Sequence, residues 1–213
     1  MLKTEQLQYT YARGSALEFE DIDCTQGQHW LLLGASGSGK TTLLHLLGGL
    51  RKPTSGTVQI HHQDITKLHG AKLDHFRGKH IGIIFQQSHF VQALTVRENL
   101  MLAQRFAGLP RDEKKILERL DRLSIADKAD KKPFQLSVGE QQRASICRAL
   151  VNGPDVILAD EPTSALDDAN CNQVIKLLKE QATSDNATLL IVTHDGRLKS
   201  SFEHSIILDK QPV

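Results

Sequence analysis

The sequence predicts an α/β fold with a mostly parallel sheet and an inserted helical subdomain. Short apolar runs indicate five buried strands, at residues 30–33, 81–85, 156–159, 189–192 and 206–208. These runs do not alternate with polar residues, which is typical of strands that are covered on both faces. Helical patterns separate several of the runs, and strands that alternate with helices favour a parallel sheet.

Length and composition narrow the class of protein. The 213 residues suit one domain, so we expect a single domain over residues 1–213. Hydrophobic residues make up 39% and charged residues 24%, which permits a core and excludes general disorder. The net charge is only +1, so we expect no nucleic-acid partner. The three cysteines lie far apart in the sequence and indicate a reducing compartment.

The chain shows no sequence feature of a membrane-spanning protein. Residues 1–6 contain no apolar signal-peptide core. No run approaches the roughly 20 apolar residues that a spanning helix needs. We therefore expect no transmembrane segment, and another protein would have to hold this one at a membrane.

Helices are predicted at several places between the strands. One covers residues 41–50 after a glycine-rich loop, and another follows Leu166. Residues 88–153 show helical patterns without a convincing strand. Within this stretch Thr95 and Glu98 have capping-box spacing, and residues 111–123 carry apolar side chains on one face. We interpret residues 88–153 as a helical subdomain inserted between core segments 1–87 and 154–213.

A phosphate-binding loop lies between the first apolar run and the first helix. The motif G-x-x-x-x-G-K-[ST] is matched by Gly34, Ala35, Ser36, Gly37, Ser38, Gly39, Lys40 and Thr41. Glycines let backbone N–H groups fold around phosphates, and the helix N-terminus adds positive potential. Lys40 would reach the β- and γ-phosphates, and the Thr41 hydroxyl could bind Mg²⁺. The motif predicts a P-loop NTPase core but does not distinguish kinases, GTPases, helicases and transport ATPases.

Two acids end the apolar run at residues 156–159. Asp160 has the position of a usual Mg²⁺ partner beside a phosphate loop. Glu161 could polarise an attacking water as a general base. The alternative is that both acids merely end a strand in solvent. A kinase or GTPase would explain Asp160 but would give Glu161 no particular role.

A second anion site is possible around Ser137. Residues 136–143 read Leu-Ser-Val-Gly-Glu-Gln-Gln-Arg, and Ser137 and Glu140 have capping-box spacing. A serine hydroxyl, the Gly139 backbone N–H and a helix N-terminus can together bind an anion. A plain helix cap would show the same spacing.

These motifs, in this order, resemble the ATP-binding subunits of ABC transporters. Residues 136–143 are similar to the L-S-G-G-Q signature of that family. The resemblance assigns the Q-loop glutamine, the Walker B aspartate, the catalytic glutamate, the D-loop aspartate, the switch histidine and the adenine-stacking aromatic to Gln86, Asp160, Glu161, Asp167, His194 and Tyr11. Tyr9 is a close rival of Tyr11. The resemblance also implies a small antiparallel β subdomain near the N-terminus.

Residues 45–50, Glu140 and residues 193–195 resemble the lipoprotein-release, macrolide-export and cell-division branch of the family. One departure is Val138, which replaces the first glycine of the signature. A branched side chain restricts the backbone and adds bulk where the opposing nucleotide should lie. Either the site tolerates this valine, or ATP-driven closure is weakened.

The resemblance implies a head-to-tail pair of ATPase subunits with ATP and Mg²⁺ at the interface. One protomer would hold the nucleotide with the phosphate loop, Thr42 and Tyr11, with Asp167 also at the nucleotide site. Ser137 and Gly139 would reach the γ-phosphate bound by the other protomer. Glu161, His194 and Gln86 would be catalytic, and the metal ligands would be Thr41, Gln86 and Asp160.

The implied partner is an integral membrane permease, which places the chain peripherally on the cytoplasmic side of the inner membrane. The implied activity is ATP hydrolysis that powers export or extraction from the membrane. One alternative is an ATPase that signals through a membrane partner to a cell-envelope process without moving solute. A soluble ABC-type ATPase is less favoured, because the chain has one ATPase unit and no sustained heptads.

Overall fold

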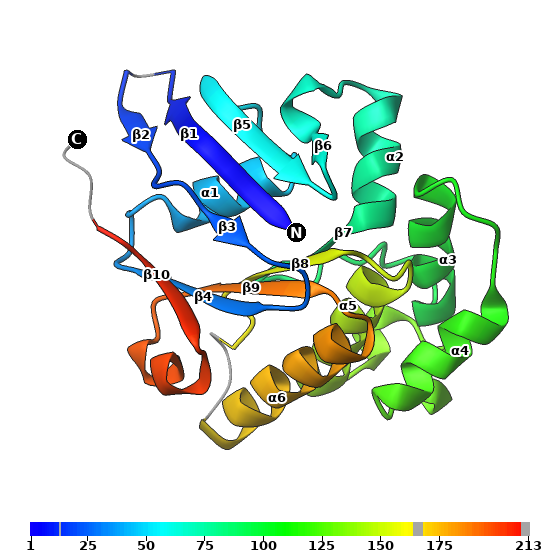
Figure 1. Cartoon of the computed structure of the whole chain (residues 1–213). Coiled ribbons are helices and arrows are strands. Elements are labelled where there is room, and N and C mark those ends of the chain that lie inside the picture. Colours follow the sequence, from blue (N-terminus) through cyan, green and yellow to red (C-terminus); the bar gives the residue numbers. More distant parts are fainter. Residues whose placement is uncertain (13, 164–167, 210–213) are drawn as a thin grey trace.

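A computed structural model describes residues 1–12, 14–163 and 168–209, and Figure 1 shows its architecture. The central sheet consists of β4 (His29–Gly34), β7 (Ile81–Ile84), β8 (Val156–Asp160), β9 (Thr188–Thr193) and β10 (His204–Leu208). The strand order is β10-β4-β9-β8-β7, and the strand pairs are parallel. The predicted parallel sheet and its five strands are confirmed.

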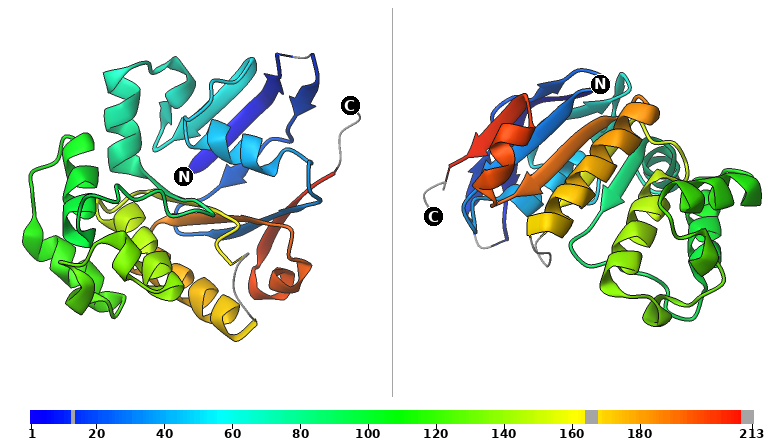
Figure 2. Two further views of the ribbon diagram at one scale, coloured as in Figure 1. Left: turned by 180° about the vertical axis from the view of Figure 1, so that it is seen from behind. Right: turned by 90° about the horizontal axis from the view of Figure 1, so that it is seen from below.

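Helices cover both faces of this sheet. Leu31 and Leu33 of β4 belong to an apolar cluster with α5 (Val138–Leu150) and α6 (Asp168–Ser184). Leu32, which points the other way, belongs to a cluster with α1 (Lys40–Leu47). Figures 1 and 2 show α1 and α6 on opposite faces. Coverage on both faces explains why the strands read as continuous apolar runs.

A second, antiparallel sheet packs on the far side of α1. It contains β1 (Leu2–Thr10), β2 (Ala16–Glu18), β3 (Asp23–Cys24), β5 (Ser55–Ile60) and β6 (Gln63–Asp64). Leu7 and Val58 of this sheet share an apolar cluster with Leu43 and Leu47 of α1. The expected antiparallel subdomain is thus present, and α1 is held between two sheets.

The chain between β7 and β8 is helical. It forms α3 (Val96–Phe106), α4 (Glu113–Arg122), the 3₁₀ turns Ala126–Lys128 and Pro133–Gln135, and α5. Thr95 and Ser137 cap α3 and α5 through reciprocal hydrogen bonds with Glu98 and Glu140, as their spacing predicted. Figure 2 shows these helices set to one side of the two sheets.

The predicted helices differ from the observed ones at their ends. The first was expected over residues 41–50, but α1 ends at Leu47 because Gly48 and Gly49 follow, and Gly49 has a φ of 63°. Helix α2 (Ala71–His80) was not predicted. None of its side chains is fully buried, so it lacks an apolar period. The remaining 3₁₀ turns are Ile65–Lys67 and Gly196–Ser201. Among the helices described, none is long and apolar enough to cross a membrane.

Candidate functional site

Neighbouring strands of the parallel sheet deliver the candidate residues to one edge. β4 leads into the phosphate loop, β7 precedes Gln86, β8 ends at Asp160, and β9 precedes His194. The ladder pairs Leu33 with Thr193 and Asp160 with Val192, so these strand ends are level with one another. The carboxyl ends of parallel strands are where ligands bind in open α/β sheets.

A cleft of about 590 Å³ opens at this edge. Its lining consists of Tyr11, Ser36, Gly37, Gly39, Lys40, Thr41, Thr42, Gln86, Glu161 and His194. The structure therefore brings together most of the predicted nucleotide-binding residues and all three predicted catalytic residues. The volume of the cleft lies within the range that is usual for small-molecule sites.

The backbone of the phosphate loop needs its glycines. Gly37 and Gly39 have φ angles of 82° and 94°, in the left-handed region that favours glycine. A Cβ on Gly34 would lie 2.5 Å from the Ser38 Oγ and 2.7 Å from the Leu208 carbonyl oxygen. Among the described residues, no side chain caps the N-terminus of α1, so its first N–H groups are available to an anion. This cradle suits a phosphate group.

Lys40 is 8% exposed and donates to its own loop. Its Nζ lies 2.8 Å from the Gly34 carbonyl oxygen and 2.9 Å from the Ala35 carbonyl oxygen. These contacts hold the ammonium group at the mouth of the loop. A phosphate in the loop would meet this positive charge directly.

Asp160 lies beneath the loop, beside Thr41. Its carboxylate accepts a hydrogen bond from the Thr41 side chain, and burial raises its pKa above the usual range, with the charge of Glu161 acting in the same direction. Among the described residues, the Asp160 Oδ1 is buried without a hydrogen-bond partner. A buried carboxylate oxygen beside a hydroxyl fits Mg²⁺, which prefers oxygen ligands.

Glu161 is held in one orientation by residues at the end of β9. Its Oε2 accepts from the Thr193 hydroxyl at 3.0 Å, and its Oε1 lies 2.8 Å from the His194 Nδ1. The His194 backbone N–H also donates to Oε1 at 3.1 Å. The backbone of Glu161 has a φ of 46°, which is strained for a residue with a side chain. The backbone conformation and the three hydrogen bonds together hold this carboxylate at the cleft.

Thr193 is a site residue that the sequence did not single out. Its hydroxyl is almost fully buried and connects Glu161 with the backbone N–H of Asp195. The available signal was a polar residue at the end of an otherwise apolar strand. That pattern alone does not reveal a carboxylate partner that lies 32 residues away in the chain.

The two tyrosines near the N-terminus have different surroundings. The Tyr11 hydroxyl shares a hydrogen bond with the Thr42 hydroxyl, and the ring lines the cleft. Tyr9 packs edge-on against Tyr11 with ring centroids 5.0 Å apart. Its hydroxyl accepts a hydrogen bond from Arg51 at 2.8 Å. Of the two tyrosines, Tyr11 is therefore the one that lines the cleft.

Comparison with known proteins identifies the family of this chain. A sequence model described as ABC transporter matches residues 19–164, which is more than half of the chain. The chain belongs to the ABC transporter family.

Relatives in this family cover the chain almost completely. The lipoprotein-releasing system ATP-binding protein LolD of Legionella pneumophila (strain Lens) is 37% identical over 98% of this chain and 94% of its own length. The macrolide export ATP-binding/permease protein MacB of Escherichia coli O157:H7 is 40% identical over 97% of this chain. The chain spans about a third of the length of the MacB proteins that it matches.

Solved ABC structures have the same fold. A dimeric, post-hydrolysis structure of the ATP-binding cassette MJ0796 bound to ADP and Pi superposes with a TM-score of 0.87 at 34% identity, covering 100% of this chain and 97% of that one. CbiO1 from Clostridium perfringens, part of an ABC transporter complex, gives a TM-score of 0.86 at 30% identity, covering 97% and 84% of the two chains.

The segment that resembles the ABC signature does not line the cleft of its own chain. Ser137 caps α5 and, like Gly139, is exposed, and neither residue lines the cleft. Val138 is the first residue of α5, is 67% exposed and does not have a positive φ. The backbone at this position therefore does not require glycine. Asp167 and the rest of the D-loop, residues 164–167, lie outside the described residues.

Proposed function

We propose that this chain is the ATP-binding and ATP-hydrolysing subunit of an ABC transporter, and that it powers a separate membrane permease. The observation that carries the proposal is the convergence of Lys40, Thr41, Gln86, Glu161 and His194 around one cleft. A kinase or GTPase would leave the paired Glu161 and His194 without a role.

In this proposal the loop binds the phosphates of ATP, and Tyr11 packs on the base. Thr41, Asp160 and Gln86 would hold Mg²⁺, which neutralises phosphate charge when bound. Glu161 orients or deprotonates the attacking water, and His194 contacts the γ-phosphate from the end of β9. Thr193 keeps the Glu161 carboxylate turned toward the cleft.

A second copy of the subunit would complete the site. Ser137 and Gly139 are exposed away from their own cleft, so in a head-to-tail pair they can reach the γ-phosphate bound by the partner. The dimeric structures of the similar cassette MJ0796 support this arrangement. Hydrolysis would remove the phosphate that joins the two halves, and the pair would open.

A groove away from the nucleotide cleft offers a place for the permease. It has a volume of about 560 Å³ and is lined largely by apolar side chains, among them Leu50, Ile83, Phe85, Ala103 and Phe106, together with Asp74 and Arg77 of α2. Gln86 and residues 88–153 would carry the opening of the pair to this groove. The chain would then lie peripherally on the cytoplasmic side of the inner membrane.

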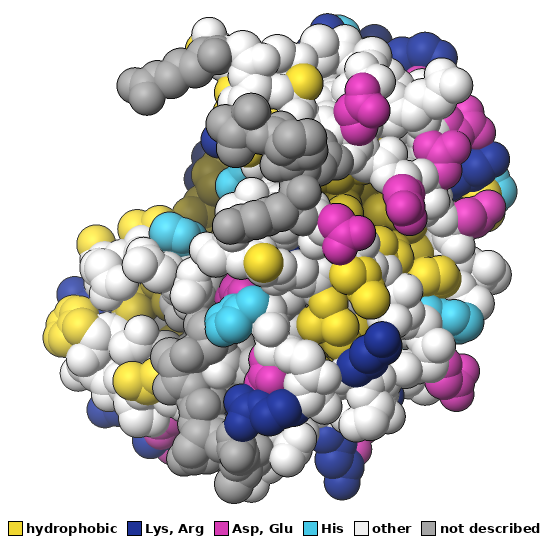
Figure 3. All heavy atoms as spheres, turned by 90° about the vertical axis from the view of Figure 1, so that its left-hand side faces the viewer, with side chains coloured by type: hydrophobic (Ala, Val, Ile, Leu, Met, Phe, Trp, Pro, Cys, Tyr) yellow, Lys and Arg dark blue, Asp and Glu magenta, His cyan; other side chains and the backbone are white. Residues whose placement is uncertain are grey.

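Two relatives are named for macrolide export and for lipoprotein release, and these names favour export or extraction from the membrane as the process. Nucleic acid is not part of the proposal. On the face that Figure 3 shows, the Lys and Arg side chains of the described residues stand apart and do not form one continuous basic patch. Such a patch would be the expected footprint of a nucleic-acid-binding protein.

The test uses the Glu161→Gln variant, which should bind ATP but lose turnover by about 100-fold or more if Glu161 is the base. The tagged variant is trapped with ATP and Mg²⁺ and extracted from native membranes in mild detergent, and its partners are identified by mass spectrometry. Lys40→Ala, which removes the phosphate contact, is the matched control. A multi-span membrane protein captured by the first variant supports the proposal. Capture of only ribosomal, DNA-bound or soluble proteins contradicts it.

A further inference from the structure

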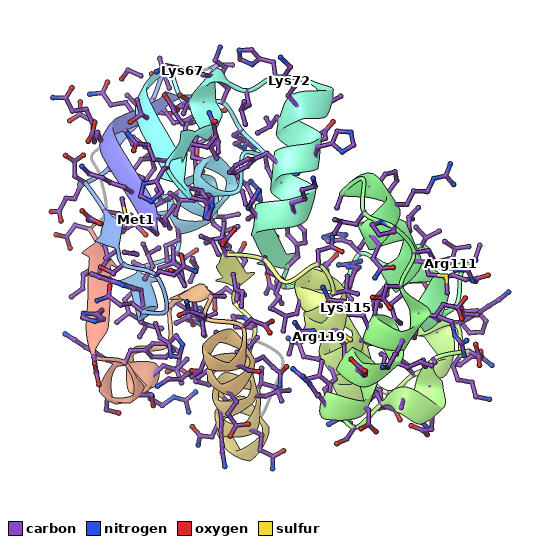
Figure 4. All side chains as sticks on the ribbon, turned by 45° about the vertical axis from the view of Figure 1, so that its right-hand side comes forward. Met1, Lys67, Lys72, Arg111, Lys115 and Arg119 are labelled. Carbon is purple, nitrogen blue, oxygen red and sulfur yellow. The ribbon has the colours of Figure 1, made fainter. Side chains whose placement is uncertain are left out.

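The apolar face of α4 contains a buried arginine. Arg119 lies on the same side of the helix as Ile116 and Leu120, and its side chain is 8% exposed. Figure 4 shows Arg119 on the inner side of the helical subdomain, whereas Arg111 lies at its outer edge. A charge on the buried face of a helix needs a partner.

The partner is Asp185, which belongs to the core of the molecule. The Arg119 Nη2 lies 2.8 Å from Oδ1 and 2.7 Å from Oδ2 of Asp185, whose side chain is 11% exposed. Asp185 directly follows α6, and the turn that carries it is fixed by backbone hydrogen bonds. Its N–H donates to the Gln181 carbonyl oxygen, and the Ala187 N–H donates to the Ala182 carbonyl oxygen. The ion pair therefore joins the helical subdomain to a rigid part of the core.

Stability alone does not account for this pair. Among the described residues, the Arg119 Nη1 and the Asp185 Oδ2 have no hydrogen-bond partner of acceptable geometry. A buried ion pair that is incompletely hydrogen-bonded is often no more stabilising than two apolar side chains of similar size. The ion pair fixes the orientation of α4 relative to the turn after α6. An apolar contact tolerates sliding and rotation, whereas a charged hydrogen bond does not.

We propose that Arg119 and Asp185 are positioning residues, which fix the angle of the helical subdomain on the core and thereby align Ser137 with the nucleotide of a partner subunit. This inference rests on the proposed function. Ile116 and Leu120, on the same face of α4 as Arg119, share an apolar cluster with Cys147 of α5, ten residues along that helix from Ser137. On the other side of the subdomain, the Gln142 side chain donates to the Pro162 carbonyl oxygen at 2.9 Å, next to Glu161.

The length of α5 makes Ser137 sensitive to the angle. Ten residues of helix span about 15 Å. A tilt of α5 by roughly 4° about Cys147 would move Ser137 by about 1 Å, and misplacement by about 1 Å can cost on the order of 100-fold in rate. Nucleotide binding by the phosphate loop of the same chain does not involve this angle, so the two properties should separate.

The experiment compares the double variant Arg119→Met/Asp185→Leu with Arg122→Met. The double variant keeps an apolar contact but removes the charged hydrogen bond that fixes the orientation. Arg122 is the matched control because it lies on the same helix and is exposed, and its Nη1 lies 3.5 Å from the Ser184 hydroxyl, next to Asp185 in the chain. Each change is made in the intact chain and in the Glu161→Gln chain. Thermal unfolding, ATP affinity of the dilute monomer, ATP-driven dimerisation by sedimentation, and ATPase rate are measured.

We expect the double variant to stay folded and to keep its ATP affinity within about twofold, while dimerisation weakens and the ATPase rate falls by at least tenfold. Asp185→Glu, which retains the charge, should recover part of the dimerisation. Unchanged dimerisation in the folded double variant would overturn the positioning role and leave the proposed function intact. If Glu161→Gln without further changes stayed monomeric with ATP, the proposed function and this inference would both fail.

Discussion

Asp160 and Glu161 are adjacent carboxylates at the end of β8, but their surroundings differ. Asp160 is buried beneath Thr41, and Glu161 accepts hydrogen bonds from Thr193 and His194. Neighbouring carboxylates in different environments can take different chemical roles. Here the buried one suits a metal ion, and the oriented one suits a base.

The raised pKa of Asp160 predicts a pH dependence of Mg²⁺ binding. A carboxyl whose pKa is raised takes up its proton at a higher pH as the solution is acidified, and a protonated carboxyl is a poor metal ligand. Mg²⁺ increases the affinity for ATP, and this gain should therefore decline at a higher pH than it would with an aspartate of ordinary pKa. Below the pKa it should fall by about tenfold per pH unit.

The measurement is ATP affinity with and without Mg²⁺ between pH 8 and pH 5. Asp160→Asn is the control, because it cannot titrate while the nucleotide itself titrates as before. The variant should show little benefit from Mg²⁺ at any pH. A benefit from Mg²⁺ that is as large in Asp160→Asn as in the wild type would show that Asp160 does not hold the metal.

Val138 is one of the residues at which segment 136–140 departs from the family signature that it resembles. Because it begins α5 with an exposed side chain and no positive φ, its replacement by glycine leaves the backbone conformation available. Glycine near a helix end costs at most about 1 kcal/mol of helix stability. We expect Val138→Gly to keep or raise the steady-state ATPase rate, with Val138→Ala as the comparison. A marked loss in both variants would mean that the valine is functionally required.

At the scale of elements, the position of α2 against α3 depends on one glycine. A Cβ on Gly78 of α2 would lie 2.7 Å from the Cα of Ala107, directly after α3. Backbone atoms cannot move aside as the end of a flexible side chain can. This close approach shapes the wall of the groove that is proposed for the permease.

Gly78→Ala should lower the free energy of unfolding by about 1–3 kcal/mol, as overpacked sites do. The intrinsic helix preference of alanine offsets at most about 1 kcal/mol of this cost. Chemical denaturation measures the effect. Gly196→Ala is the matched control, because a Cβ there meets no atom within 4 Å and the position has no positive φ. Equal stability of the two variants would contradict the close packing of α2 on α3.

At the scale of the whole molecule, the proposed head-to-tail pair would place the cleft and the signature segment of one chain in different sites. Lys40→Ala damages the cleft but leaves Ser137 intact, whereas Ser137→Asp damages the signature but leaves the cleft intact. If the two variants are mixed in equal amounts, half of the head-to-tail dimers would contain one copy of each. Such a dimer would have one complete site and one damaged site. Activity should then recover to about a quarter of the wild-type rate.

Each variant alone should be nearly inactive, and the recovered rate should follow the concentration of the mixed dimer. A double variant that carries both changes in one chain, mixed with either single variant, is the control and should restore nothing. Full activity of Ser137→Asp by itself would show that the signature takes no part in hydrolysis. Absence of recovery with both single variants folded and dimeric would argue against sites shared between protomers.

The sequence by itself determined the parallel sheet, the phosphate loop and the two capped helices. These features depend on local causes: apolar runs, glycines with a following lysine and threonine, and capping-box spacing. Helix α2 and Thr193 escaped prediction because neither has a local signature. The choice of Tyr11 over Tyr9 at the cleft likewise needed the contact of Tyr9 with Arg51.

Tertiary structure alone decided which distant residues meet. Thr193 and His194 orient Glu161 because β8 and β9 are neighbours in the sheet. Arg119 finds Asp185 because α4 packs beside the end of α6, 66 residues away in the chain. Sequence patterns indicate the local preferences of the backbone and the face of each helix or strand that is buried. Contacts between remote segments depend on how the elements pack, and packing is a property of the whole folded chain.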